Sequence, residues 1–175
     1  MTGTPRYLVH PSPIGDVMIV TDDERILTLH PLAGPLEAEL ERLALTWHAV
    51  PEEEATDAAI RAATQLDEYF DGSRQSFDLP LDWSSVRGFT REALQAVCEI
   101  PYGETAGYGE VAIMAGRARA ARAVGTACAT TPFSIVVPVH RVVRADGSLG
   151  EYGGHPEVKR YLIDLEQGIL GSAGV

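Results

Sequence analysis

The segment SIVVPVHRVVR, residues 134–144, places a histidine and an arginine directly after a run of apolar residues. Histidine is a frequent general base because its ordinary pKa lies close to neutral pH, and arginine is a permanent positive charge. Val139 stands between Pro138 and His140, and it has neither a lone pair nor an acidic proton. The segment therefore resembles the surroundings of a reactive centre in which the residue beside His140 is inert.

Charged residues are distributed unevenly along the 175-residue chain, whose formal net charge is −11. Residues 1–83 carry 5 basic and 16 acidic side chains, whereas residues 84–175 carry 9 of each. Within the second half, residues 117–144 contain five arginines and no acid. This stretch is either a chance gap between acids or a basic face that meets phosphates on an otherwise acidic protein.

Composition argues against several classes of protein. No run of about 18 apolar residues is present, so neither a membrane span nor a membrane partner is expected. The first residues lack the features of a signal peptide, and two cysteines, Cys98 and Cys128, cannot form a disulfide framework, so a cytoplasmic location is expected. The spacing of His10, His30 and His48 gives no chelating motif. We therefore expect neither a metal nor a cofactor.

Alternation of apolar and polar residues predicts three short antiparallel strands within the first thirty residues. Helical spacing follows at residues 34–45 and 52–70. The apolar face of the second helix is predicted to contain Ile60, Ala63, Leu66 and Phe70. Residues 76–83 are predicted to be an extended linker. Together these elements predict an N-terminal α+β domain over residues 1–83.

The second half is predicted to be mostly helical. The expected helices cover residues 89–100, 107–116, 117–130 and 155–168. The middle two are joined by a tight turn at Gly116 and the second carries arginines, which is the pattern of a helix-turn-helix. A strand is predicted at residues 133–137. Residues 84–175 are therefore expected to form a separate C-terminal domain.

Six stretches, taken in order, resemble the O6-alkylguanine-DNA alkyltransferases, also called methylated-DNA–protein-cysteine methyltransferases. They are SPIG (12–15), LDEYFDG (66–72), IPYGETAGYGEVA (100–112), ARAVG (121–125), VPVHRVV (137–143) and GEYGGHPEVKRYLIDLE (150–166). The resemblance covers nearly the whole chain and is most specific in the second half. It implies a ribonuclease H-like antiparallel sheet with helices in the N-terminal domain and a winged helix-turn-helix-type C-terminal domain.

The resemblance also implies a mechanism. In this family a helix-turn-helix enters the minor groove of double-stranded DNA, an arginine replaces the extruded base, and the alkylated guanine rotates into a pocket. A cysteine in a Pro-Cys-His-Arg motif then takes the alkyl group irreversibly. A histidine, oriented by a glutamate, draws off the thiol proton through a water.

Matching the motifs one residue at a time assigns Arg122 to the gap in the base stack and Tyr108 to rotation of the nucleotide. His140 matches the proton-relay histidine, and Glu166 matches its orienting carboxylate. Outside this motif, Arg122 would read as a solvated helix residue, and Tyr108 and His140 as core residues. Further DNA contacts are expected from Arg117, Arg119 and Arg141. The pocket is expected to be lined by Thr131, Pro138, Tyr152, Gly153 and Gly154.

Three residues depart from the family pattern. Val139 stands in place of the acceptor cysteine, so transfer of an alkyl group to this position is chemically excluded. Thr131 replaces the usual asparagine, and Gln95 stands where many members have a tryptophan. Neither Cys98 nor Cys128 lies beside the motif histidine, so we do not expect either to replace the nucleophile.

Three functions are compatible with this pattern. The favoured one is a non-enzymatic binder of alkylated DNA that acts in damage recognition with other repair proteins, similar to the alkyltransferase-like proteins. Those relatives typically lack the N-terminal domain and usually carry tryptophan at the acceptor position. The second is a repurposed pocket in which His140, Glu166 and Tyr108 perform acid–base chemistry on a small molecule. The third is an engineered inactive alkyltransferase, which the several changed positions disfavour.

Overall fold

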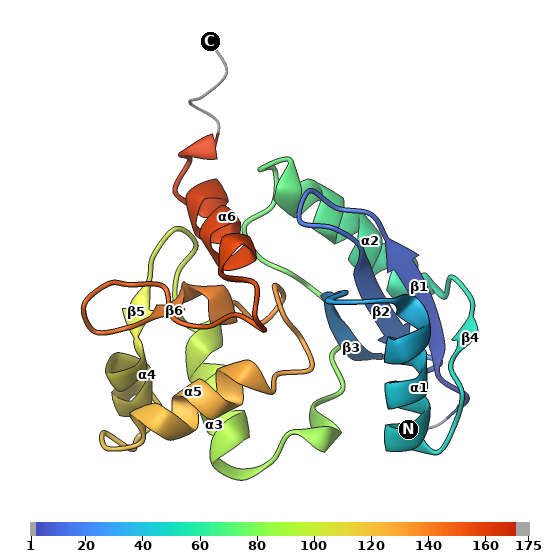
Figure 1. Cartoon of the computed structure of the whole chain (residues 1–175), viewed down its shortest axis with the longest axis horizontal. Coiled ribbons are helices and arrows are strands. Elements are labelled where there is room, and N and C mark those ends of the chain that lie inside the picture. Colours follow the sequence, from blue (N-terminus) through green and yellow to red (C-terminus); the bar gives the residue numbers. More distant parts are fainter. Residues whose placement is uncertain (1–2, 171–175) are drawn as a thin grey trace. The chain divides into compact units, whose positions relative to one another are not determined.

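The computed structural model describes residues 3–170, which separate into two compact units between Asp82 and Trp83. The first unit contains a four-stranded sheet with two helices, and the second is mostly helical (Figure 1). The α+β class predicted from the sequence is confirmed. No helix within the described residues is long and apolar enough to cross a membrane.

The first unit is built on an antiparallel meander, and the three strands predicted in the first thirty residues are present. Strand β1 pairs with β2 and β2 pairs with β3, giving the sheet order β3-β2-β1-β4. The elements are β1 (Arg6–His10), β2 (Val17–Thr21), β3 (Ile26–Pro31), α1 (Leu36–Trp47), β4 (Glu52–Glu53) and α2 (Asp57–Phe70). The turn between β1 and β2 is closed by two backbone hydrogen bonds between Ser12 and Gly15, and Gly15 adopts a positive φ of 100°.

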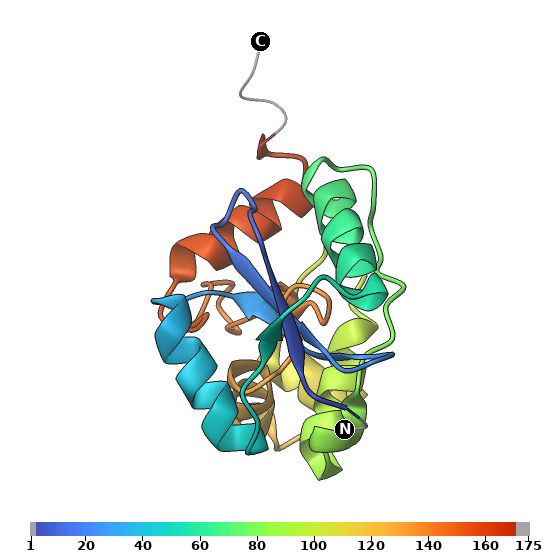
Figure 2. The ribbon, with the colours of Figure 1, turned by 90° about the vertical axis from the view of Figure 1, so that its right-hand side faces the viewer.

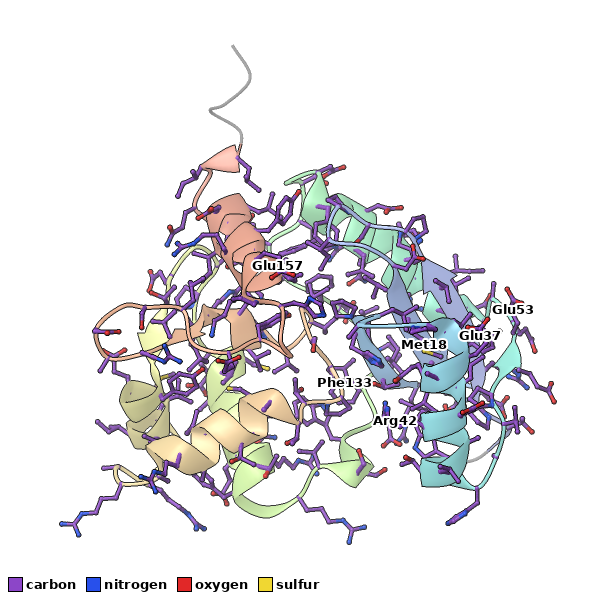
Figure 3. The ribbon with its side chains drawn as sticks, viewed as in Figure 1. Met18, Glu37, Arg42, Glu53, Phe133 and Glu157 are labelled. Carbon is purple, nitrogen blue, oxygen red and sulfur yellow. The ribbon has the colours of Figure 1, made fainter. Side chains whose placement is uncertain are left out.

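Helices cover both faces of this sheet because β2 directs successive side chains to opposite sides (Figure 2). Met18 and Val20 face α1, where they pack with Leu43, and Figure 3 shows Met18 beneath this helix. The opposite face meets α2. There the hydroxyl groups of Thr21 and Thr56 are hydrogen-bonded at 2.8 Å, and Thr56 also caps the start of α2.

Two details of the first unit differ from the sequence prediction. Glu52 and Glu53 form β4 and do not belong to the predicted helix over 52–70, because their backbone completes the free edge of β1 as a short parallel strand. Ile60 is 50% exposed, although it is predicted to lie on the apolar face. The buried residues of α2 are Ala59, Ala62, Ala63, Gln65, Leu66 and Tyr69. This stripe leaves Ile60 about 140° away from its centre line around the helix axis.

The second unit packs its helices around α3. Both α4 and α5 lie against α3 and against each other, while α6 packs on the 3-10 turn η2 (Figure 1). The elements are η1 (Trp83–Ser85), α3 (Gly88–Cys98), β5 (Ala106–Gly107), α4 (Tyr108–Met114), α5 (Ala121–Ala129), η2 (Val139–Arg141), β6 (Val142–Val143) and α6 (Pro156–Glu166).

A two-stranded parallel pair determines which ends of these elements meet. Ala106 of β5 lies opposite Val142 of β6, and Gly107 lies opposite Val143. Because β5 leads directly into α4 and β6 follows directly on η2, the pairing brings the start of α4 close to the His-Arg turn.

Two predictions in the second unit are wrong in detail. Residues 133–137 do not form a strand; they make a tight turn with one isolated bridge between Ser134 and Val137, and Ile135 adopts a φ of 73°. A short, largely apolar run does not distinguish a strand from a turn by its pattern alone. The arginine-rich helix begins at Ala121 and not at Arg117, because residues 117–120 form the turn after Gly116.

The packing of α2 on the sheet gives a test with a control on the same helix. Leu66 is fully buried, so Leu66→Ala should lower the free energy of unfolding by about 2–5 kcal/mol. The same truncation at the half-exposed Ile60 should cost less than about 1 kcal/mol. Urea unfolding followed by circular dichroism measures both. Equal losses for the two variants would contradict the burial stripe.

Candidate functional site

The His-Arg segment forms one buried 3-10 turn. Its backbone is held by hydrogen bonds from Val139 N to Val137 O at 2.8 Å and from Arg141 N to Pro138 O at 2.9 Å. Pro138 and the three residues of η2 are all buried, and Val139 is only 4% exposed. The side chains of the Pro-Val-His-Arg sequence are thus buried.

Glu166, the last residue of α6, connects this turn to the rest of the unit. Its Oε1 lies 2.7 Å from His140 Nε2, and Arg141 donates to both carboxylate oxygens at 2.8 and 3.0 Å. The backbone N–H of Gly103 adds a bond of 3.3 Å to Oε2, and Arg141 also donates to Ile100 O at 2.6 Å. One buried carboxylate therefore joins α6, η2 and the loop after α3.

The charges in this cluster determine the state of the imidazole. Burial alone raises the pKa of Glu166, but hydrogen bonds from His140 and Arg141 outweigh it and lower the pKa to about 2. Burial lowers the pKa of His140, and this effect exceeds the opposite influence of Glu166. An ionised carboxylate only accepts hydrogen bonds, so Nε2 carries the ring proton and Nδ1 carries the lone pair. His140 is therefore a neutral, oriented base at pH 7.

Tyr108 is held at the first position of α4. The carboxylate of Glu110 accepts a hydrogen bond from Gly107 N at 2.9 Å, which fixes the start of the helix. The tyrosine ring lies against Gly125 of α5, and a Cβ at Gly150 would lie 3.0 Å from its hydroxyl oxygen. Gly150 also has a φ of 75°, so a side chain there would be both strained and crowded.

Lys159 is a buried cation that the sequence interpretation overlooks. Its amine donates to Val142 O and lies 5.8 Å from the centre of the Tyr108 ring. Burial lowers its pKa to about 8. A lysine is ordinarily read as a surface residue, but this one shares the helical spacing of the buried Leu162, Ile163 and Glu166. That spacing is the signal by which it could have been found.

The predicted DNA-contacting arginines occupy two different environments. Arg122 lies exposed in the first turn of α5, and Arg117 and Arg119 lie exposed in the turn between α4 and α5. Arg117 is 3.8 Å from a carboxylate oxygen of Glu92. Arg141, in contrast, is buried, and its guanidinium donates hydrogen bonds to the carboxylate of Glu166 and to Ile100 O. The prediction of a DNA contact by Arg141 is therefore corrected. The ion pair with Glu166 holds the Arg141 side chain in the interior, away from the surface that DNA could contact.

The predicted pocket residues lie in the loops before η2 and before α6. The hydroxyl of Thr131 accepts a hydrogen bond from Phe133 N at 3.2 Å, which braces the turn ahead of Pro138. The ring of Tyr152 is half-buried, and burial raises the pKa of its hydroxyl. Gly153 and Gly154 follow at the exposed surface with positive φ.

The two cysteines are poorly prepared as nucleophiles. The side chain of Cys98 reaches the surface, but the surrounding protein partly removes its thiol from water and raises its pKa. Burial raises the pKa of Cys128 to about 11 despite the nearby charge of Lys159. Both are therefore thiols at neutral pH, whereas the reactive form is the thiolate. Within residues 3–170, no group of three or more histidines, cysteines or acids is placed to hold a metal.

The Glu166 cluster generates a prediction for stability. The folded-state pKa of Glu166 lies below its ordinary 4.5, so its contribution is complete above about pH 4.5 and is lost as the pH falls toward 2. This contribution amounts to about 3 kcal/mol. Glu166→Gln should lower the free energy of unfolding at pH 7 by about 3–5 kcal/mol, because Arg141 is left buried without its counter-charge.

Urea unfolding at pH 7 and pH 3 tests this prediction, with Glu104→Gln as an exposed control. The Glu166 variant should also lose much of the acid dependence seen in the parent. A variant as stable as the control would show that the carboxylate does not hold the unit together.

Comparison with known proteins identifies relatives over almost the whole length. The family model for the ribonuclease-like domain of 6-O-methylguanine DNA methyltransferase matches residues 6–83, and that for its DNA binding domain matches residues 88–168. The methylated-DNA–protein-cysteine methyltransferase of Methanosarcina barkeri is 36% identical over 164 residues, covering 94% of this chain and 98% of the relative.

Solved structures agree with these matches. The crystal structure of Mycobacterium tuberculosis O6-methylguanine methyltransferase superposes with a TM-score of 0.79 at 36% identity, covering 94% of both chains. A structure of Mycobacterium tuberculosis OGT in complex with DNA gives 0.77 at 35% identity, covering 94% of this chain and 93% of the other. With both domains matched in order along one chain, this protein belongs to the methylated-DNA–protein-cysteine methyltransferase family.

Proposed function

We propose that this family member binds O6-alkylguanine in double-stranded DNA, extrudes the base into the pocket beside η2, and does not accept the alkyl group. The observation that carries the proposal is Val139, which stands where the family motif has its acceptor cysteine, buried beside an intact His140–Glu166–Arg141 cluster. Its role would then be recognition of damage on behalf of other repair proteins.

The chemistry of the site supports the absence of transfer. Attack on an alkyl carbon needs a lone pair, which a valine side chain lacks. His140 is a neutral base with no thiol beside it to deprotonate. The thiols of Cys98 and Cys128 remain protonated at neutral pH because the surrounding protein removes them in part from water and raises their pKa values. A branched apolar side chain at position 139 would instead pack against the alkyl substituent.

The surface of α5 supports contact with DNA. Arg122, at its first turn, is exposed and has no ion-pair partner within the described part of the chain. An exposed arginine at a helix start suits insertion between base steps in the minor groove. Tyr108, held between Gly125 and Gly150, is suited to press on the sugar–phosphate of the nucleotide that rotates. The Mycobacterium tuberculosis relative solved with DNA favours the same partner.

The charge distribution should make the proposed DNA binding sensitive to salt concentration. The first 83 residues carry the whole net charge of −11, and the remainder is neutral. Attraction to DNA would therefore depend on a few exposed arginines and would weaken as salt screens them.

Lesion preference is the first test. At about 0.1 M salt, the protein should bind a duplex with one O6-methylguanine at least about tenfold more tightly than the unmodified duplex, equivalent to about 1.4 kcal/mol. Arg122→Gln should reduce this preference, because the gap in the base stack is no longer filled. Arg119→Gln, an equal change of charge nearby, should weaken both duplexes alike. Fluorescence anisotropy measures all three, and equal affinity of the parent for both duplexes would rule out the proposal.

Restoring the nucleophile is the second test. Val139→Cys should gain the mass of a methyl group in place of a hydrogen when mixed with the same lesion duplex, because His140 is positioned to activate the new thiol. The parent and Val139→Ser should gain nothing, since a hydroxyl is a far weaker nucleophile. Intact-mass spectrometry is the readout. A folded Val139→Cys protein that stays unmodified would favour a pocket repurposed for a small molecule.

A further inference from the structure

A surface hollow of about 470 Å³ lies in the second unit, where the start of α3 meets the end of α5. It is lined by Ser85, Val86, Arg87, Thr90, Thr130 and Pro132. The lining thus contains one guanidinium and three hydroxyl groups and no acid. None of the residues assigned to the base pocket or to the extruded nucleotide takes part in it.

The side chains of Ser85, Arg87 and Thr90 in this hollow are available to a ligand, whereas the hydroxyl of Thr130 already donates to Thr126 O at 2.8 Å. Arg87 donates only from Nε, to Ser84 O at 3.3 Å, and no carboxylate within residues 3–170 forms an ion pair with it. The hydroxyls of Ser85 and Thr90 make no hydrogen bond within the same residues. A guanidinium fork beside hydroxyl donors matches an anion that presents several oxygens, and a phosphate is the commonest such group.

The position of the hollow relative to α5 indicates where that phosphate would come from. Arg122 lies at the first turn of α5 and Thr130 follows its last residue, so the two are separated by about 12 Å along the helix axis. A helix with its side chains is about 10–12 Å wide, whereas the minor groove is only about 6 Å wide. A helix entering that groove therefore approaches the phosphates on both strands, and groups beside its ends meet them.

We propose that this hollow binds one phosphodiester of the DNA backbone, with Arg87 as its cation and the hydroxyls of Ser85 and Thr90 as donors. The inference rests on the proposed DNA binding and deepens it. The contact fixes α5 along the strand and does not read the lesion, because it meets a group common to every nucleotide.

The salt dependence of DNA binding tests the hollow directly in the full chain. Arg87→Gln should weaken binding to the O6-methylguanine duplex and to the unmodified duplex by the same factor, about five- to tenfold at 0.1 M salt. The slope of log affinity against log salt should become shallower by about 0.9, the value for one lost phosphate contact. Arg87→Lys should keep most of the slope. Arg61→Gln, an exposed arginine of α2 in the first unit, removes the same charge and should leave the slope unchanged.

The outcomes separate this inference from the proposed function. A slope for Arg87→Gln equal to that of Arg61→Gln overturns the inference, even where lesion preference is present. If the hollow binds a free anion but not the DNA backbone, Arg87→Gln likewise leaves the salt slope unchanged, and the inference is overturned. A parent without lesion preference whose slope still depends on Arg87 overturns the proposed function and leaves the phosphate contact standing.

Discussion

The buried carboxylate of Glu166 is the interaction on which the second unit depends. It accepts hydrogen bonds from His140, from Arg141 and from the backbone of Gly103, so a single side chain connects the end of α6 to η2 and to the loop after α3. Arg141 balances the negative charge, which removes the need for a protonated histidine. His140 can therefore remain neutral in a buried site, and its ring is fixed in one orientation.

This arrangement is prepared for proton transfer, yet the adjacent residue offers no proton. Buried ion pairs contribute little net stability compared with well-packed apolar side chains of similar size, because desolvation offsets their attraction. Stability alone is therefore a weak reason to keep such a cluster beside Val139. Its presence supports the proposed function, in which η2 would form a wall of fixed shape for an alkylated base. The exposed Arg122 of α5 and the tightly held Tyr108 would serve the same proposed function.

Much of the fold could be predicted from local patterns, and the failures share a cause. The three-stranded meander was accessible because its short strands are rich in β-branched and apolar residues and are separated by clear turns, although β2 is buried throughout and does not alternate. The turn at residues 133–137 was not, since a short apolar run looks like a strand and does not reveal the left-handed backbone of Ile135. The charges of Arg141 and Lys159 predict surface positions, but each side chain is buried against a partner distant in sequence. Arg141 meets a carboxylate 25 residues away, and Lys159 meets a backbone carbonyl 17 residues away.

Extrusion of the alkylated guanine is the central claim of the proposed function, and fluorescence of 2-aminopurine placed next to the lesion tests it directly. This base is quenched while stacked, so flipping of its neighbour should raise its emission when the protein binds the O6-methylguanine duplex. The unmodified duplex should show a much smaller rise at equal saturation, and Arg122→Gln should reduce the rise in the lesion duplex. Saturating binding with no change in emission would show that the lesion stays stacked and would contradict recognition by base flipping.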